Sequence, residues 1–262
     1  MPYSAPLKYA LGLTASLCAT LGTALAGEQR NEVVTPPPPV SAWEFRIEPY
    51  LWASGLNGTT GVRHFTSDVN VPFKDVFSHL DMAAALQFEA RKGRWGFVAD
   101  GFYAKLSASG SVPTPLDRTA DVGIKQFTGD LYAAYRFAES STGFVDAYAG
   151  IRDNYMSLDL SARGPTHSLD LWESENWIDP IVGLRGQWNI NEKFFLAAQG
   201  DIGGFGVGAD FAWALQGTAG YNFTNKVSAE LGYRYYKTDY SNGGFNYNIA
   251  ASGMMLGVNI KF

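Results

Sequence analysis

The sequence predicts an all-β protein folded as one up-and-down antiparallel transmembrane β-barrel, with ten strands expected and eight or twelve as alternatives. From residue 43 onward, apolar and polar residues alternate with the period of two that strands require. The breaks between these runs alternate between tight turns and longer loops, as they do in outer-membrane barrels. Only 17% of the residues are charged, below the ~25% of average soluble domains, which suits strands that face lipid.

The first expected strand, 43–55, illustrates the alternation. Phe45 and Leu51 fall on its apolar face, whereas Glu48 and Tyr50 fall on its polar face. Because the expected strand number is even, both ends of the barrel should lie on the same, periplasmic side. The expected strands are 43–55, 80–91, 95–109, 120–138, 144–160, 176–190, 194–202, 211–224, 227–240 and 245–262.

Two segments are expected to precede the barrel, which covers 43–262. Residues 1–26 are expected to be a signal peptide, because Lys8 precedes an apolar stretch that ends in a small-x-small cleavage site. Residues 27–42 contain four consecutive prolines and are expected to form an extended periplasmic linker. An uncleaved inner-membrane anchor is the alternative, and the polar sequence after residue 26 disfavours it.

The only cysteine, Cys18, lies inside the expected signal peptide. Lipid attachment there is disfavoured because Leu17 stands where a small residue is needed. Loss of the signal peptide leaves 19 basic and 25 acidic residues, a net charge of −6, which gives no reason to expect nucleic acid as a partner. No later run reaches the ~20 apolar residues of a transmembrane helix.

Aromatic residues gather next to the breaks and predict two girdles, one at each membrane interface. Those beside the tight turns are Trp43, Trp95, Phe137, Phe144, Trp188, Phe194, Phe223 and Phe262. Those beside the longer loops are Tyr103, Tyr155, Trp177, Phe211, Tyr235 and Phe245. A soluble β-sandwich is the alternative, but its strands would recur every ~8–12 residues, whereas several runs here are longer than that spacing.

The first long break contains the spacing of a short helix. Apolar residues from Phe73 to Leu80 recur at i, i+3, i+4 and i+7, with Pro72 where a helix tolerates proline. Two interpretations are open. The segment is either a plug folded over the barrel mouth or a loop packed on the barrel rim, and the second is favoured. Residues 59–71 could also form an extra hairpin, which would give twelve strands.

Several segments resemble a family of proteobacterial outer-membrane β-barrel proteins described as outer-membrane or porin-like. They are 48–53 (EPYLWA), 91–96, 179–185, 200–208 (GDIGGFGVG) and 232–235. The alternating final strand, which ends in Phe262, resembles the C-terminal signature that the barrel-insertion machinery reads. The resemblance implies the fold and an outer-membrane location, and it implies no ligand and no catalytic residue.

An enzyme is not expected. Omptin-like proteases are ten-stranded and carry an Asp-x-His motif, whereas Val62, Phe77 and Pro165 stand two residues before the three histidines here. The His-x-Ser motif of lipid A deacylase-like barrels is also absent. His64, His79 and His167 are therefore expected to be solvated loop residues. No cofactor, metal ligand or catalytic residue is predicted.

Inward-facing charges are the most informative set in the barrel. A closed salt-bridge network is the favoured interpretation, because a ten-stranded barrel is narrow and long side chains can bridge it. A narrow channel for small polar solutes is the alternative. Seven predicted lumen residues are expected at similar depth, about mid-barrel: Glu48, Asp100, Asp130, Arg152, Arg185, Asp201 and Arg234. Arg46 and Glu230 are expected nearer the periplasm, together with Glu89 and Asp146, and Asp179 is expected nearer the outside.

These observations predict an integral outer-membrane barrel with a structural or envelope role, with a porin-like channel as the alternative and an enzyme or adhesin disfavoured. Expected partners are outer-membrane lipids, lipopolysaccharide and the barrel-insertion machinery. The sequence leaves the oligomeric state open.

Overall fold

The computed structural model describes residues 42–62, 65–112, 118–163 and 168–262. The expected signal peptide and almost all of the expected linker, together with His64 and His167, lie outside the described residues. The elements are β1 (Glu44–Val62), β2 (Phe65–Val71), α2 (Phe73–Ser78), β3 (Leu80–Lys92), β4 (Trp95–Val112), β5 (Arg118–Ser140), β6 (Gly143–Arg163), β7 (Ser168–Asn189), β8 (Phe194–Gly203), β9 (Phe211–Asn222), β10 (Val227–Asn242) and β11 (Phe245–Lys261).

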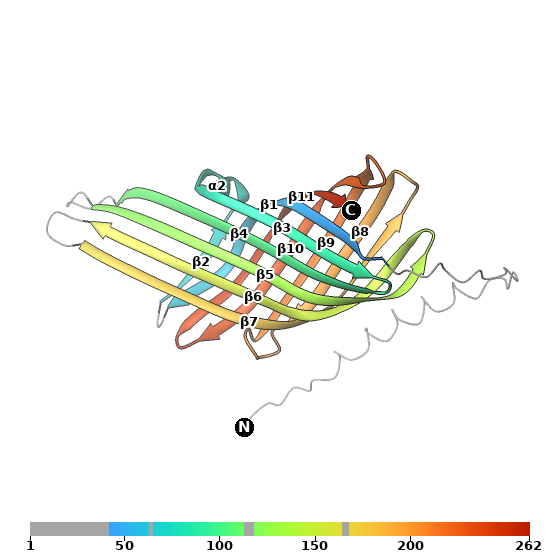
Figure 1. Ribbon diagram of the computed structural model, residues 1–262. Helices are drawn as coiled ribbons and strands as arrows, with labels where there is room; N and C mark the ends of the chain where they lie inside the picture. Colours follow the sequence, from blue (N-terminus) through green and yellow to red (C-terminus); the bar gives the residue numbers. More distant parts are fainter. Residues whose placement is uncertain (1–41, 63–64, 113–117, 164–167) are drawn as a thin grey trace, which may run out of the picture. The chain divides into compact units, whose positions relative to one another are not determined.

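The strands form a closed antiparallel barrel, as the alternation predicts (Figure 1). Each strand from β3 to β11 pairs with the next, β1 pairs with β3, and β11 closes the ring on β1. Ten strands make the ring, because β2 pairs with β1 alone. The prediction of a ten-stranded barrel is confirmed.

The extra hairpin considered at 59–71 also forms, but it does not widen the ring. β1 runs on to Val62 and turns into β2, so that its outer half pairs with β2 and its inner half, 44–49, pairs with β3. Between these halves, residues 50–55 have no strand on that side. Helix α2 packs against β1 there, and a Cβ on Gly55 would lie 2.9 Å from the Val71 carbonyl oxygen, so glycine permits the close approach.

Helix α2 occupies the segment where the sequence predicts one. Its residues are exposed or half-buried, and Phe73 and Phe77 pack on each other with ring centroids 5.7 Å apart. Figure 1 shows the helix at the barrel wall beside β3. This position agrees with the packed-loop interpretation and not with a plug across the mouth.

The two ends of the barrel differ in the lengths of their connections. Tight turns at 93–94, 141–142, 190–193 and 223–226 join strands at one end, which also carries residue 44 and Phe262 and which we call the short-turn end. At the opposite, long-loop end, β4–β7 extend further than expected, because 110–112 and 168–175 continue the ladders instead of forming loops.

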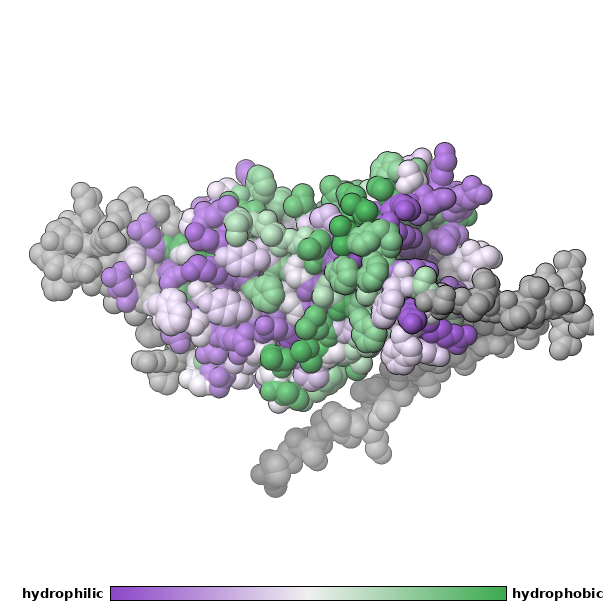
Figure 2. All heavy atoms as spheres, in the orientation of Figure 1, coloured by the Kyte–Doolittle hydropathy of each residue, from purple (hydrophilic) through white to green (hydrophobic). Residues whose placement is uncertain are grey.

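Alternation along the strands makes the outer wall apolar and the interior polar. Outward-facing Leu51, Leu131, Leu184 and Leu256 are between 49% and 64% exposed, and Figure 2 shows a band of apolar side chains between more polar ends. Exposing such a band to water would cost much free energy, whereas exposing it to lipid would not. Among the described residues, no helix has the length and hydropathy needed to cross a membrane.

Lipid contact with this band predicts the effect of a charge placed on it. Leu256→Arg should reduce the free energy of unfolding in lipid vesicles by about 2–4 kcal/mol, since arginine is costly at the middle of a bilayer. The measurement is urea unfolding of the refolded protein, with folding confirmed by the heat-dependent gel shift. Trp172→Arg is the matched control, because Trp172 is 65% exposed on the extended part of β7. Equal effects of the two substitutions would contradict lipid contact at Leu256.

Candidate functional site

The interior holds charged side chains at two levels, of which the first lies toward the short-turn end. Glu89 on β3 and Asp146 on β6 are its carboxylates, and they share the guanidinium groups of Arg46, Arg91, Arg136 and Arg185. Arg185 joins the two acids, since its Nη2 lies 2.6 Å from Glu89 Oε1 and 3.1 Å from Asp146 Oδ2. This level therefore connects side chains from five strands across the lumen.

Arg152 on β6 forms the second level with two carboxylates. Its Nε and Nη2 each donate to Asp130 on β5 at 2.8 Å. Its Nη1 and Nη2 donate to Asp201 on β8 at 2.9 and 3.0 Å. The three side chains are at most 3% exposed. Two buried bidentate contacts hold this guanidinium in one position, which is the geometry that makes a buried ion pair strong.

Arg234 on β10 continues the second level to the opposite wall. Its Nη1 lies 3.1 Å from the Tyr50 hydroxyl and 3.4 Å from Asp100 Oδ2 on β4, and Tyr50 itself donates to Asp100 at 3.0 Å. Because β11, β1 and β3 separate β10 from β4 in the ring, this contact reaches across the barrel interior. The Trp52 ring packs against the guanidinium, whose Cζ is 5.1 Å from the ring centroid.

Asp179 on β7 lies further toward the long-loop end and fixes the β8–β9 connection. Its carboxylate accepts the Ala209 amide at 2.6 Å and the Asn154 side-chain amide at 3.0 Å. Asn154 Oδ1 in turn accepts the Tyr236 hydroxyl at 2.9 Å. The bonds hold residues 204–210 at the barrel rim.

An aromatic cluster fills the lumen beyond Asp179. The Trp177 ring stacks on Tyr240 with centroids 4.2 Å apart, and Tyr236, Tyr247 and Ile249 are buried around them. Phe245 packs against the same cluster. Trp177 and Phe245 therefore face inward, and the prediction that they belong to the lipid-facing girdle is wrong.

Phe144 is the third aromatic residue that the girdle prediction places wrongly. Its ring lines the interior at the short-turn end, with the Arg136 guanidinium 3.8 Å above the ring centroid. It shares strand parity with Asp146, so alternation counted from the buried acid would have placed it correctly. Nearness to a turn does not decide which face of a strand a residue occupies.

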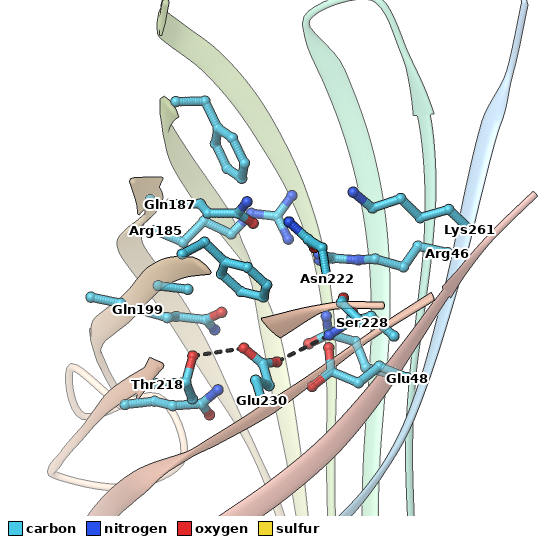
Figure 3. A pocket seen from close by; sticks show the side chains of 18 residues that line it. Arg46, Glu48, Arg185, Gln187, Gln199, Thr218, Asn222, Ser228, Glu230 and Lys261 are labelled. Atoms are coloured by element: carbon cyan, nitrogen blue, oxygen red, sulfur yellow. Dashed lines mark hydrogen bonds between the residues drawn. The ribbon is translucent and has the colours of Figure 1, made fainter. Parts of the chain in front are cut away.

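The cavities of the interior are largest at the short-turn end and smallest at the second charged level. A cavity of about 460 Å³ opens at the short-turn mouth, and a side cavity of about 60 Å³ continues from it (Figure 3). Between Arg152 and Arg234 only about 10 Å³ remains. Since one water needs about 10–15 Å³, the second level leaves room for about one water molecule.

Glu48 and Glu230 line the side cavity and stand apart from the arginine network. Glu230 accepts the Thr218 hydroxyl at 2.6 Å and the Asn259 amide at 3.3 Å (Figure 3). Glu48 Oε1 and Asn259 Oδ1 are buried without a hydrogen-bond partner among the described residues. In that part of the chain neither glutamate has a basic nitrogen within 4.0 Å.

The structure places all ten predicted lumen residues on the inner face of the barrel, but it groups them differently from the expectation. Arg185, expected at the depth of Arg152, lies at the first level with Glu89. Glu48, expected at the same mid-barrel depth, lines the side cavity with Glu230. The sequence reasoning did not single out Arg91 or Tyr148, whose hydroxyl donates to Asp201 at 2.9 Å. Both follow from alternation, because Arg91 is two residues after Glu89 and Tyr148 is two after Asp146.

The comparisons with known proteins concern the fold. No family model matches the chain, and no curated protein matches it significantly. The outer-membrane protease OmpT from Escherichia coli is 12% identical, with 88% of this chain and 100% of that chain covered and a TM-score of 0.54. The translocator domain of the autotransporter NalP from Neisseria meningitidis is 10% identical, with 95% and 94% covered and a TM-score of 0.44.

Neisserial surface protein A is 13% identical, with 84% of this chain and 97% of that chain covered and a TM-score of 0.35. At these identities the likeness to OmpT describes the barrel fold and not a shared chemistry. The chain has the fold of bacterial outer-membrane β-barrels.

The buried contacts of Arg152 predict a large loss of stability when the arginine alone is removed. Arg152→Met should lower the free energy of unfolding by about 3–5 kcal/mol, because Asp130 and Asp201 would remain buried without their counter-charge. Arg152→Met combined with Asp130→Asn and Asp201→Asn should recover most of that loss. Urea unfolding of the refolded barrel measures both.

The control for this prediction is Lys105→Met, which removes a half-exposed ion pair with Asp81 at 3.4 Å. Exposed pairs contribute about 0–1 kcal/mol, so this variant should unfold almost as the parent does. If Arg152→Met behaved like Lys105→Met, the buried network would not be what stabilises the interior.

Proposed function

We propose that this chain is an integral outer-membrane β-barrel with a closed, salt-bridged lumen and a structural role in the cell envelope. The observation that carries the proposal is the Arg152 guanidinium, which Asp130 and Asp201 hold on one side of the lumen and which is nearly inaccessible to solvent. Arg234 and its partners close the remaining half of the same level. A hydrated ion would have to break these charge-assisted bonds in order to pass.

The closed lumen predicts that the refolded mature chain is electrically silent in a planar bilayer. The control is a variant in which Arg152, Asp130 and Asp201 are all replaced by alanine, which removes the charges together and opens the second level. This variant should give discrete conductance steps, once the heat-dependent gel shift confirms that both proteins are folded. Reproducible steps from the parent protein would instead support the narrow, porin-like channel.

An outer-membrane location is part of the proposal. It is supported by the apolar outer band, by the fold and by the sequence of the expected signal peptide. The short-turn end then faces the periplasm, and the lipids and lipopolysaccharide of the outer membrane contact the outer wall. Phe262 ends the strand that closes the ring, where its amide donates to the Phe45 carbonyl, and this strand is the one that the barrel-insertion machinery would bind.

Cysteine labelling tests this orientation. Because Cys18 is the only cysteine and lies in the expected signal peptide, single cysteines can be introduced without a background thiol. Asn242→Cys, at the exposed tip of β10, should react with an impermeant maleimide on intact cells. Glu192→Cys, in an exposed tight turn, should react only after the outer membrane is opened. The reverse pattern would contradict the orientation.

We also infer that the chain is not an enzyme. His79 is the histidine in the described part of the chain, and its Nδ1 lies 2.8 Å from the Asp75 carbonyl oxygen within its own exposed segment. Ser78 Oγ lies 3.0 Å from the same Nδ1, but it belongs to the same exposed segment and donates to the Asp75 carbonyl oxygen at 2.9 Å, so the two side chains form a turn at the end of α2. We therefore infer no catalytic role for this histidine. Among the described residues, no cluster of three or more His, Cys, Asp and Glu side chains is arranged to hold a metal ion.

A further inference from the structure

Glu48, Glu230 and Asn259 come together at the place where the barrel closes. Glu48 is on β1, Asn259 on β11 and Glu230 on β10, and β11 is the strand that pairs with β1 to complete the ring. The carboxyl groups of the two glutamates lie within hydrogen-bond reach of each other. All three side chains are buried, at 4%, 7% and 3% exposure. The seam thus contains two adjacent buried acids.

In the described part of the chain, the two buried acids form no direct ion pair with a basic side chain. Two carboxylates in contact repel each other, and burial removes the water that would screen them. Arg46 lines the same cavity, but its Nη2 is bound to Glu89 at 2.8 Å. Arg185 lies there as well and is bound to Glu89 and Asp146. Among the described residues, neither arginine therefore forms a direct ion pair with Glu48 or Glu230.

Asn259 supplies an independent indication of a ligand. Its amide group donates one bond to Glu230, yet its Oδ1 is buried and has no partner within the described residues. A buried amide oxygen without a partner costs free energy, and a cation or a water molecule in the adjoining cavity would satisfy it. Glu48 Oε1 is unpartnered in the same way. A cation could be bound by both of these oxygens.

Gly257 allows the Glu48 carboxyl group to occupy this position. A Cβ at residue 257 would lie 2.5 Å from Glu48 Oε1, so any larger residue would displace the carboxylate. The adjoining cavity of about 60 Å³ has room for a cation and a few water molecules. It shares Arg46, Phe144 and Lys261 with the larger cavity at the mouth, which provides an entry path.

We propose that Glu48, Glu230 and Asn259 bind a hard, oxygen-ligated cation of the Ca²⁺ type that bridges the closure seam of the barrel. Carboxylate and amide oxygens are the ligands that such cations take, and the cavity supplies water for the remaining positions. Ca²⁺ suits the site better than Mg²⁺, because side chains from three strands give an irregular geometry that Ca²⁺ tolerates. The ion joins β1, β10 and β11.

Lys261 is the residue that competes with this cation. It lines the same cavity and carries no ion pair among the described residues, so its ammonium repels an approaching cation. Removing its charge should therefore strengthen Ca²⁺ binding. This expectation separates a cation site from a lysine–glutamate pair, in which the same substitution would only destabilise the fold.

The test is equilibrium dialysis of radioactive Ca²⁺ against the refolded mature chain in uncharged detergent at neutral pH. We expect saturable binding of one Ca²⁺ per chain, its loss in Glu230→Gln and in Glu48→Gln, and tighter binding in Lys261→Gln. Glu44→Gln is the matched control, because Glu44 is an exposed acid at the same mouth, and it should bind as the parent does. The gel shift confirms that each variant is folded.

A second measurement keeps the proposal testable if a glutamate variant fails to fold. Since an ion that binds only the folded barrel stabilises it by mass action, Ca²⁺ should raise the urea midpoint of the parent and EDTA should lower it. Absence of saturable binding by the folded parent would overturn the proposal and assign a shared proton to the glutamate pair. Equal loss of binding in Glu44→Gln would overturn it as well, because the ion would then belong to the mouth.

Discussion

The interior of this barrel is organised by the burial of the Arg152 guanidinium between Asp130 and Asp201. A guanidinium withdrawn from water is unfavourable unless every charge and donor around it is matched. Here two carboxylates from β5 and β8 match it in bidentate geometry. Since β6 carries the arginine and β7 separates it from β8 in the ring, the side chain reaches over β7 on the inner face to contact Asp201.

The remaining interior follows from this central constraint. Arg152 and its two carboxylates cover one side of the lumen, and Arg234 with Tyr50 and Asp100 covers the other. A cavity of only about 10 Å³ remains between the two groups. Because that level is full, solvent from the short-turn mouth reaches only the first charged level and the side cavity beside Glu48. The two glutamates thus lie beside a cavity that leads to the short-turn mouth, and no arginine forms an ion pair with them among the described residues, which is the basis for proposing a cation at the closure seam.

Alternation together with the spacing of the turns made the barrel, its strand number and the inward-facing charges predictable from sequence, because side chains point to alternate faces along every strand. The partners of each charge were not predictable. Arg185 was expected at the depth of Arg152, yet it binds Glu89 and Asp146 at the first level, since depth in a tilted barrel depends on register and not on distance from a turn. Trp177 was misplaced for a related reason: its parity with Asp179 puts it inside, whatever its distance from a loop.

Along β4–β7 the outward residues change from apolar to polar and the inward residues change from polar to apolar. The position of this change marks the end of the apolar band. Nearer the short turns, Leu131 faces outward and Asp130 inward, whereas beyond Phe127 the outward residue is Lys125 and the inward one is Ile124. On β6 the inward residues likewise pass from Arg152 and Asn154 to Met156, which packs against the aromatic cluster. A sheet in lipid must be apolar outside, and the same sheet in water must be polar outside, so one continuous strand reverses its pattern where the solvent changes. The apolar band of the outer wall therefore ends before the extended parts of β4–β7, and the aromatic cluster fills the lumen with apolar side chains as the core of a water-soluble barrel would.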